Sequence, residues 1–416
     1  MTNTAITKNN PYLELFHNHN FIYIWGSQML SQVTIFLVNF LIILRIFEVT
    51  RSSVAVSLVW IFYAMPAIIL GPFAGTITDI ISKRKILILT TFIEGIAVLG
   101  YLLVREKTWP IYTIIFIYSL VNQLYTPAEA STLPAVVSKK LLPIANSLFL
   151  FTVYAAMLVG FGLSGPLTRL VGQEWPFVIA ASLLFIASYM VSKLPKDGNG
   201  KLGDLSDFWI RAKEGYIYIK ERPLVLFPLI LLVGTQVFAS IITVIAPSYA
   251  TEALHLDLRD AGPVFVIPLA IGAISAAYAI NRFLITKFRK KRIISFGLLI
   301  GSCGFLALGF IVPFLGSLKT IMAEIAILFL GISLVSILIP VQTLIQETTP
   351  EEFRGRVFGV LGFTITLASV LPVLLVAAIA DVLGTNIVMG IIGISIAFIA
   401  YYSRKELYEI YTNHRA

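Results

Sequence analysis

The residues most able to carry out chemistry are four glutamates that lie inside long apolar runs or near the ends of such runs. They are Glu94, Glu129, Glu324 and Glu347. Glu94 follows the start of the run 86–104 by about 13 Å, at 1.5 Å of rise per helical residue. An ionised carboxylate at that depth in a bilayer is costly, so an acid kept there commonly serves a function such as proton transfer. We therefore expect the four to be candidates for proton coupling. For Glu94, a protonated side chain hydrogen-bonded to a neighbouring helix is an equally good interpretation.

The other residue types that carry chemistry are sparse. Cys303 is the single cysteine, and the four histidines lie outside the apolar runs. A disulfide framework and a cysteine or histidine metal site are therefore not indicated. The sequence also lacks a G-x-x-x-x-G-K-[ST] loop for nucleotide phosphates. We expect no enzyme activity, no metal and no cofactor.

Apolar runs of membrane length must position these acids. Hydrophobic residues make up 58% of the 416 residues and charged residues 13%, whereas soluble proteins are about half apolar and about a quarter charged. A helix needs about 20 apolar residues to cross a bilayer. The sequence predicts an all-α membrane protein with twelve transmembrane helices in two six-helix bundles, at residues 21–47, 54–80, 86–104, 111–127, 144–170, 176–194, 224–250, 262–285, 293–314, 320–343, 355–382 and 385–403.

The basic residues indicate the orientation of these spans. Short cytoplasmic loops carry an excess of Lys and Arg. With the amino terminus inside, most of the 31 Lys and Arg are cytoplasmic, and the exceptions are Arg45, Arg51, Arg105, Lys107, Arg169, Arg259 and Lys319. We expect a multi-pass protein of the cell (plasma or inner) membrane with both termini cytoplasmic. Topology then accounts for the net charge of +9, and a nucleic-acid partner is not needed.

The longest polar segment divides the spans into two sets of six. We predict a bundle at 1–194, a cytoplasmic linker at 195–223 and a second bundle at 224–416. Within the linker, residues 206–222 mix aromatic, aliphatic and charged side chains, which fits either an amphipathic interfacial helix or a solvated tether. Charged turns fall at equivalent places in both halves, such as S-K-R-K-I (82–86) and R-K-K-R-I (289–293). Such repetition is typical of transporters built from two repeats.

Three stretches resemble the major facilitator superfamily of secondary transporters. The turn G-T-I-T-D-I-I-S-K-R-K (75–85) is similar to the superfamily's loop between spans two and three, although Ile80 and Ser82 stand where Arg and Gly are usual. Residues 126–148 and 349–359 resemble the branch that holds macrolide-efflux and enterobactin-export proteins. The resemblance covers almost the whole chain.

The resemblance implies a gate at the first of these stretches. In the superfamily the acid of this loop faces the start of span eleven, where a helix amino terminus favours negative charge. The gate would latch the outward-facing state, and Asp79 as a mere marker of the membrane surface is the alternative. The residues implied are Gly75, Asp79, Lys83, Arg84, Arg354 and Arg356.

The resemblance also implies a central cavity lined by spans one, four, seven and ten. Amides together with aromatics suit an amphiphilic molecule better than a small ion, although helix–helix hydrogen bonds explain each one equally well. The stretch G-F-G-L-S-G-P (160–166) is similar to a Gly-rich antiporter motif, with close helix packing as the alternative. The candidates for substrate contact are Gln28, Gln32, Asn39, Asn122, Gln123, Tyr125, Gln236 and Gln342.

The resemblance implies a secondary active transporter that works by alternating access. We expect proton-coupled efflux of an amphiphilic small molecule, drug-like or siderophore-like. The expected partners are this substrate, a proton or other coupling ion, and the lipid bilayer, with the protein as a monomer. A lysophospholipid or lipid flippase of the same fold is the alternative within transport. A membrane-integral scaffold or enzyme is the alternative from another class.

Overall fold

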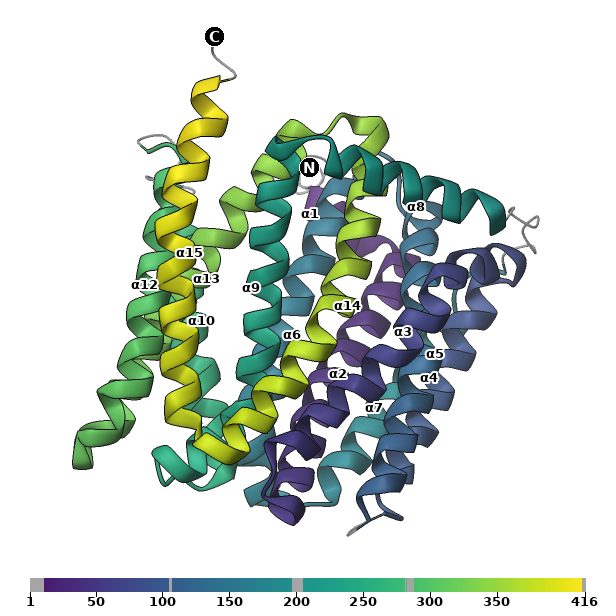
Figure 1. Ribbon diagram of the computed structural model, residues 1–416. Coiled ribbons are helices and arrows are strands. Elements are labelled where there is room, and N and C mark those ends of the chain that lie inside the picture. The colour runs from purple at the N-terminus through teal and green to yellow at the C-terminus, as the bar shows by residue number, and fades with distance from the viewer. Residues whose placement is uncertain (1–10, 105–106, 197–204, 281, 283–287, 414–416) are drawn as a thin grey trace, which may run out of the picture. The chain divides into compact units, whose positions relative to one another are not determined.

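The computed structural model describes residues 11–104, 107–196, 205–280, 282 and 288–413, and these ranges contain helices and turns without a strand. For some residues inside helices it describes the backbone alone. Ten helices in the described part are long and apolar enough to cross a membrane. The all-α membrane fold predicted from the apolar runs is confirmed (Figure 1).

The helices follow the apolar runs of the sequence. In the first half they are α1 (Pro11–His17), α2 (His19–Thr50), α3 (Ser53–Ile80), α4 (Lys83–Gly100), α5 (Thr108–Val136), α6 (Leu142–Val171) and α7 (Trp175–Ser192). In the second half they are α8 (Leu205–Lys220), α9 (Pro223–Ser248), α10 (Ala261–Ala279), α12 (Lys290–Phe310), α13 (Lys319–Thr348), α14 (Glu351–Leu383) and α15 (Thr385–Asn413). Short helices lie between them: the π-helix η2 (Tyr249–Ala253) and the 3-10 helices η3 (Leu258–Asp260), η5 (Val312–Phe314) and η6 (Gly316–Leu318). The segment that could be helix or tether is therefore helical, as α8.

Proline and glycine set several of these boundaries. Pro176 and Pro223 occupy the first turns of α7 and α9, where the missing N–H would have no intrahelical partner anyway. Gly172 and Gly384 follow α6 and α14 with φ of 86° and 88°, a conformation that favours glycine after a helix.

Helix α5 is longer than the predicted span 111–127. It continues through Pro127 and Pro134 to Val136, because membrane helices tolerate proline where other groups satisfy the freed carbonyls. The extension keeps Glu129 inside the helix.

Contacts divide the chain into two compact units. Unit 1 is Met1–Arg45 with Val59–Leu205, and unit 2 is Ile46–Leu58 with Ser206–Ala416. In unit 1, α4 packs against α5 and α7. In unit 2, α12 packs against α13 and α15, α10 packs against α13, and α9 packs against α14. The segment Ile46–Leu58, which connects α2 to α3, therefore belongs with the helices of the second half.

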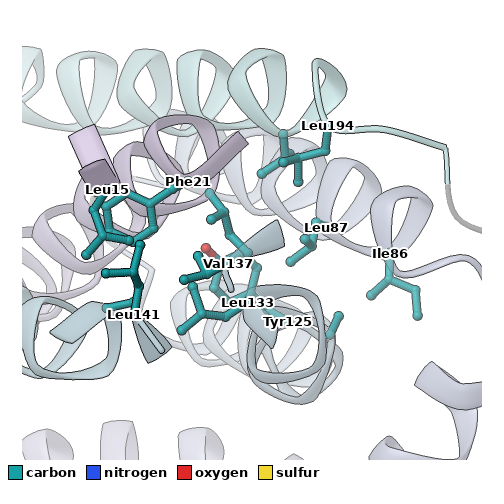
Figure 2. Close-up of a cluster of buried hydrophobic side chains, with 13 residues drawn as sticks. Leu15, Phe21, Ile86, Leu87, Tyr125, Leu133, Val137, Leu141 and Leu194 are labelled. Atoms are coloured by element: carbon teal, nitrogen blue, oxygen red, sulfur yellow. The ribbon is translucent and has the colours of Figure 1, made fainter. Parts of the chain in front are cut away.

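An apolar cluster at one end of unit 1 fixes the ring of Tyr125. Figure 2 shows this ring beside Leu133 and Val137, with Phe21 and Leu87 in the same cluster. Protein interiors are close-packed, so a ring in such surroundings has little freedom to move. The cluster therefore sets where the Tyr125 hydroxyl can point.

Candidate functional site

A buried carboxyl–amide pair joins α4 to α5. Glu94 is 0% exposed, and its Oε1 accepts a hydrogen bond from Asn122 Nδ2 at 3.0 Å. The other oxygen, Oε2, has no hydrogen-bond partner in the described part of the chain. The hydrogen bond to a neighbouring helix that we considered for Glu94 is therefore present. A proton can therefore bind at Oε2.

A second carboxyl lies one turn from a tyrosine on α5. The Tyr125 hydroxyl donates to Glu129 Oε1 at 2.9 Å. Ser27 and Ser31 of α2 are 0% and 1% exposed, and they lie beside the Tyr125 hydroxyl. Among the described residues neither serine hydroxyl has a hydrogen-bond partner within normal distance. The Tyr125 hydroxyl thus lies next to a carboxyl of its own helix and to two hydroxyls of α2.

These groups share one face of α5. Asn122, Tyr125 and Glu129 follow each other at spacings of three and four residues, which places them in one helical row. Tyr118, one turn earlier, is close enough to both Glu94 and Tyr125 for electrostatic interaction. The structure therefore brings Glu94 together with Asn122 and Tyr125 together with Glu129, along a single helix.

Sequence reasoning did not single out Ser27, Ser31 or Tyr118. The two serines are four residues apart within the run 21–47, and this spacing puts them on one helix face. Small hydroxyls in an apolar helix commonly bond to their own backbone, however. Their position beside Tyr125 depends on helix packing, which the sequence does not display.

The predicted amides divide by environment. Gln28 is 2% exposed, and its Nε2 donates to the Phe149 carbonyl of α6 at 3.1 Å. Gln123 Nε2 donates to the Ser119 carbonyl of its own helix at 3.3 Å. Gln28 therefore makes a helix–helix hydrogen bond, the alternative considered for these amides, whereas Gln123 bonds within its own helix. Gln32, Asn39 and Gln236 are partly buried, and Gln342 is exposed.

The two acids of α13 have a different setting from Glu94. Glu347 is exposed and forms an ion pair with Lys290 at the start of α12. Glu324 is partly buried. An exposed acid with a lysine partner is a weaker candidate for proton binding than a buried acid without one.

The predicted gate lies partly outside the described part of the structure. Asp79 is in the last turn of α3 and Arg354 in the first turn of α14, but the side chains of Asp79 and Arg354 and the surroundings of Gly75 are not described. The described basic side chains have partners. Arg84 donates to the Ser192 carbonyl, Lys83 also has an interaction partner, and Arg356 pairs with Glu214 of α8 at 2.8 Å. The latch stays a prediction.

An acid that the sequence did not point to holds the start of α3 within unit 2. Asp381 Oδ1 accepts from the Ser53 N–H at 2.7 Å. Its Oδ2 accepts from the Ser52 hydroxyl at 2.6 Å and from the Val54 N–H at 3.1 Å. The first N–H groups of a helix have no intrahelical acceptors, so this carboxylate acts as a cap supplied by α14.

The Gly-rich stretch of α6 provides a close helix contact. A Cβ on Gly160 would lie 2.5 Å from Phe36 Cβ and 2.8 Å from Leu37 N of α2. Gly162 has open space at the corresponding position. Close packing, one of the two interpretations of this stretch, therefore explains Gly160.

Comparisons with known proteins agree on the family. The model of the Major Facilitator Superfamily matches residues 24–373. "Uncharacterized MFS-type transporter YfiS" of Bacillus subtilis (strain 168) is 25% identical over 366 residues, 86% of this chain and 83% of the relative. "Macrolide efflux protein A" of Streptococcus pyogenes is 26% identical over 384 residues, 88% of this chain and 90% of the relative.

Solved structures show the same fold. A crystal structure of the nucleoside transporter NupG matches with a TM-score of 0.71 at 10% identity, covering 93% of this chain and 99% of that chain. The POT family transporter PepTSo matches with a TM-score of 0.71 at 14% identity, covering 95% and 99%. The family model spans most of the sequence and the resemblance predicted from three charged turns is confirmed: the chain belongs to the Major Facilitator Superfamily, a family of membrane transporters.

Proposed function

We propose that this transporter exports an amphiphilic small molecule, drug-like or siderophore-like, by alternating access coupled to proton entry. One observation carries the proposal: Glu94 and Glu129 each meet a hydrogen-bonding side chain on the same face of α5. Helix α5 corresponds to span four, which the resemblance assigns to the central cavity. The likeness to Macrolide efflux protein A supports an amphiphilic substrate.

The chemistry of these acids favours the proton as coupling ion. In the described part of the chain, neither Glu94 nor Glu129 forms an ion pair. A carboxylate in apolar surroundings without a cation is costly, and taking up a proton removes the charge. A sequence without a nucleotide-phosphate loop also needs another energy source for uphill transport.

The remaining parts of the proposal concern placement. The charge distribution supports a cell-membrane protein with both termini in the cytoplasm. Asp79 with Arg354 or Arg356 would latch the outward-facing state, and the protein would act as a monomer. Amides and aromatics on α2, α5, α9 and α13 would contact the substrate.

Transport in proteoliposomes with an imposed pH gradient tests the proposal. The probes are a radiolabelled macrolide, a siderophore and a lysophospholipid. We expect gradient-driven movement of the macrolide or the siderophore, and its loss when a protonophore is added. Glu94→Gln and Glu129→Gln should each weaken the dependence on the gradient, whereas Glu347→Gln, which alters an exposed ion pair, should not.

Three outcomes would contradict the proposal. Movement of the lysophospholipid alone would favour the flippase interpretation. Macrolide transport that ignores the pH gradient in the wild-type protein would exclude proton coupling. Unchanged gradient dependence in both Glu94→Gln and Glu129→Gln would remove these acids from the coupling mechanism.

A further inference from the structure

One hydrogen-bond donor, the Tyr125 hydroxyl, lies among several possible acceptors in the cluster of Ser27, Ser31, Tyr125 and Glu129. Tyr125 is 3% exposed, and its hydroxyl has one proton to donate. It has three acceptors nearby, because Glu129 lies one turn away on α5 and the two serines lie opposite on α2. In the structure the Tyr125 hydroxyl donates its hydrogen bond to Glu129. The two serine hydroxyls have no hydrogen-bond partner in the described part of the chain.

Most of this cluster is buried. Ser27 and Ser31 are 0% and 1% exposed, and the Tyr125 ring is packed in the apolar cluster of Figure 2. Glu129 is partly buried. A proton can bind its carboxyl without the cavity of about 300 Å³ or more that a drug-sized molecule needs.

Protonation changes the hydrogen bonds that the Glu129 carboxyl can make. An ionised carboxylate only accepts hydrogen bonds, and it holds a hydroxyl donor strongly. A protonated carboxyl is a weaker acceptor and has an O–H to donate. The Tyr125 hydroxyl can then rotate about its C–O bond toward a serine that otherwise has a buried, unsatisfied hydroxyl, a costly state.

We propose that Glu129 is a proton-binding site and that Tyr125 transmits its state to α2 by moving its hydrogen bond from Glu129 to Ser27 or Ser31. The inference rests on the proposed proton coupling and names the residues that would carry it. The atoms balance simply: one proton from water adds to a Glu129 oxygen, and the Tyr125 proton stays on its own oxygen throughout.

The surroundings leave few other titratable groups to consider. In the described part, Tyr125 is the titratable side chain that interacts with Glu129. From α2 the facing groups are the uncharged Ser27 and Ser31, and Tyr118 of α5 is the further titratable group near Tyr125. Helix α2 is therefore the neighbouring helix whose polar groups can respond when Glu129 takes up a proton.

Infrared spectroscopy of the purified full-length protein tests the inference without any substrate. A pH titration in detergent follows the carbonyl stretch of protonated carboxyl groups. Glu129→Gln should abolish one such band that persists in Glu94→Gln. At a fixed pH within the titration, Tyr125→Phe should strengthen the band, because ionised Glu129 loses its donor.

The double variant Ser27→Ala, Ser31→Ala should change the band in the opposite direction. It removes the acceptors that Tyr125 uses when Glu129 is protonated, so the band should weaken at the same pH. Ser164→Ala is the matched control, because Ser164 is also fully buried but bonds to the Gly160 carbonyl of its own helix. A double variant that behaves like Ser164→Ala would overturn the inference, as would a Glu129→Gln spectrum that loses no band.

The two proposals fail in different experiments. If no probe responds to a pH gradient in proteoliposomes, the proposed coupling fails whatever the spectra show. If the wild-type protein transports in a gradient-dependent way but the serine and tyrosine variants leave the Glu129 band unchanged, the hydrogen-bond exchange fails and the coupling stands. Gel filtration of each variant is the control that checks whether the protein is folded and monodisperse.

Discussion

At the level of single residues, Glu94 and Glu129 differ in where their partners lie. The bond from Asn122 to Glu94 joins two helices and therefore contributes to the packing of α4 on α5. The bond from Tyr125 to Glu129 stays within α5, and it reaches another helix only through the serines of α2. A change at Glu94 should therefore act first on stability, and a change at Glu129 first on the response to pH.

The Asn122→Ala variant tests the structural role of the first pair. It leaves a completely buried carboxyl without its one cross-helix donor. Removing one partner of a buried hydrogen bond costs about 1–3 kcal/mol. We expect a lower free energy of unfolding, measured as a clear fall in the thermal unfolding midpoint in detergent.

A neighbouring amide supplies the control for this variant. Gln123 is adjacent to Asn122, but its Nε2 bonds to Ser119 of its own helix. Gln123→Ala should therefore change the unfolding midpoint much less than Asn122→Ala. Equal losses in the two variants would show that the Glu94–Asn122 bond adds little to stability.

At the level of elements, the sequence predicted helices well and their contacts poorly. The run 54–80 became α3 (Ser53–Ile80), because apolar length alone specifies a membrane helix. The predicted span 111–127 ends at a proline, yet α5 continues through Pro127 and Glu129 to Val136.

The contacts of the site depend on information that apolar runs lack. Residue type identified Glu94 and Asn122 separately, but their meeting depends on how far α4 is shifted along α5 and how each is rotated. Membrane helices pack through the detailed shape of small residues and through interhelical hydrogen bonds, and the pattern of apolar runs does not reveal that register. Pairs within one helix, such as Tyr125 and Glu129, follow directly from their spacing of four residues.

Helices α10 and α13 approach each other through two glycines. A Cβ on Gly272 would lie 2.0 Å from the Leu328 carbonyl oxygen, and one on Gly331 would lie 2.0 Å from the Leu269 carbonyl oxygen. Gly331→Ala must therefore separate the helices, and overpacking of this kind costs about 1–3 kcal/mol. We expect a lower thermal unfolding midpoint and a lower yield of monodisperse protein.

Gly362 of α14 provides the matched control for Gly331. It is also helical, but an added Cβ would meet no atom within 4 Å. Alanine is the better helix former by about 1 kcal/mol, so Gly362→Ala should be neutral or stabilising. A Gly331→Ala protein as stable as Gly362→Ala would show that the close contact of α10 and α13 can relax without loss.

The cap that α14 provides for α3 leads to a prediction about charge. Asp381→Ala removes three hydrogen bonds at the start of α3, and the loss of an N-terminal cap costs about 0.5–2 kcal/mol. We expect a lower unfolding midpoint, with Asp381→Asn intermediate because its amide keeps one acceptor oxygen. The measurement is thermal unfolding of both variants in detergent.

A variant at Glu252, whose negative charge acts on Asp381, should have the opposite effect on stability. The two acids repel each other, so Glu252→Gln should leave the unfolding midpoint unchanged or raise it. If Glu252→Gln and Asp381→Ala destabilised the protein equally, the loss would reflect general disturbance of this region. The cap would then not be the cause.

At the level of the whole molecule, the asymmetry of basic residues predicts the orientation of the chain in the membrane. The Lys and Arg clusters at 83–85, 139–140 and 289–292 follow even-numbered predicted spans, so all three should lie on one side of the membrane. The side on which each cluster lies can be measured with the full-length protein in intact cells.

Single cysteines in a Cys303→Ser background report the side of each turn. Lys139→Cys lies between α5 and α6, and Ser317→Cys lies in η6 between α12 and α13; both positions are exposed. A membrane-impermeant maleimide added to intact cells should label Ser317→Cys and spare Lys139→Cys, and after lysis it should label both. The reverse pattern would place both termini outside, because the positions flank opposite ends of the spans. Labelling of Lys139→Cys in intact cells at the rate of Ser317→Cys would contradict the assignment of sides from charge.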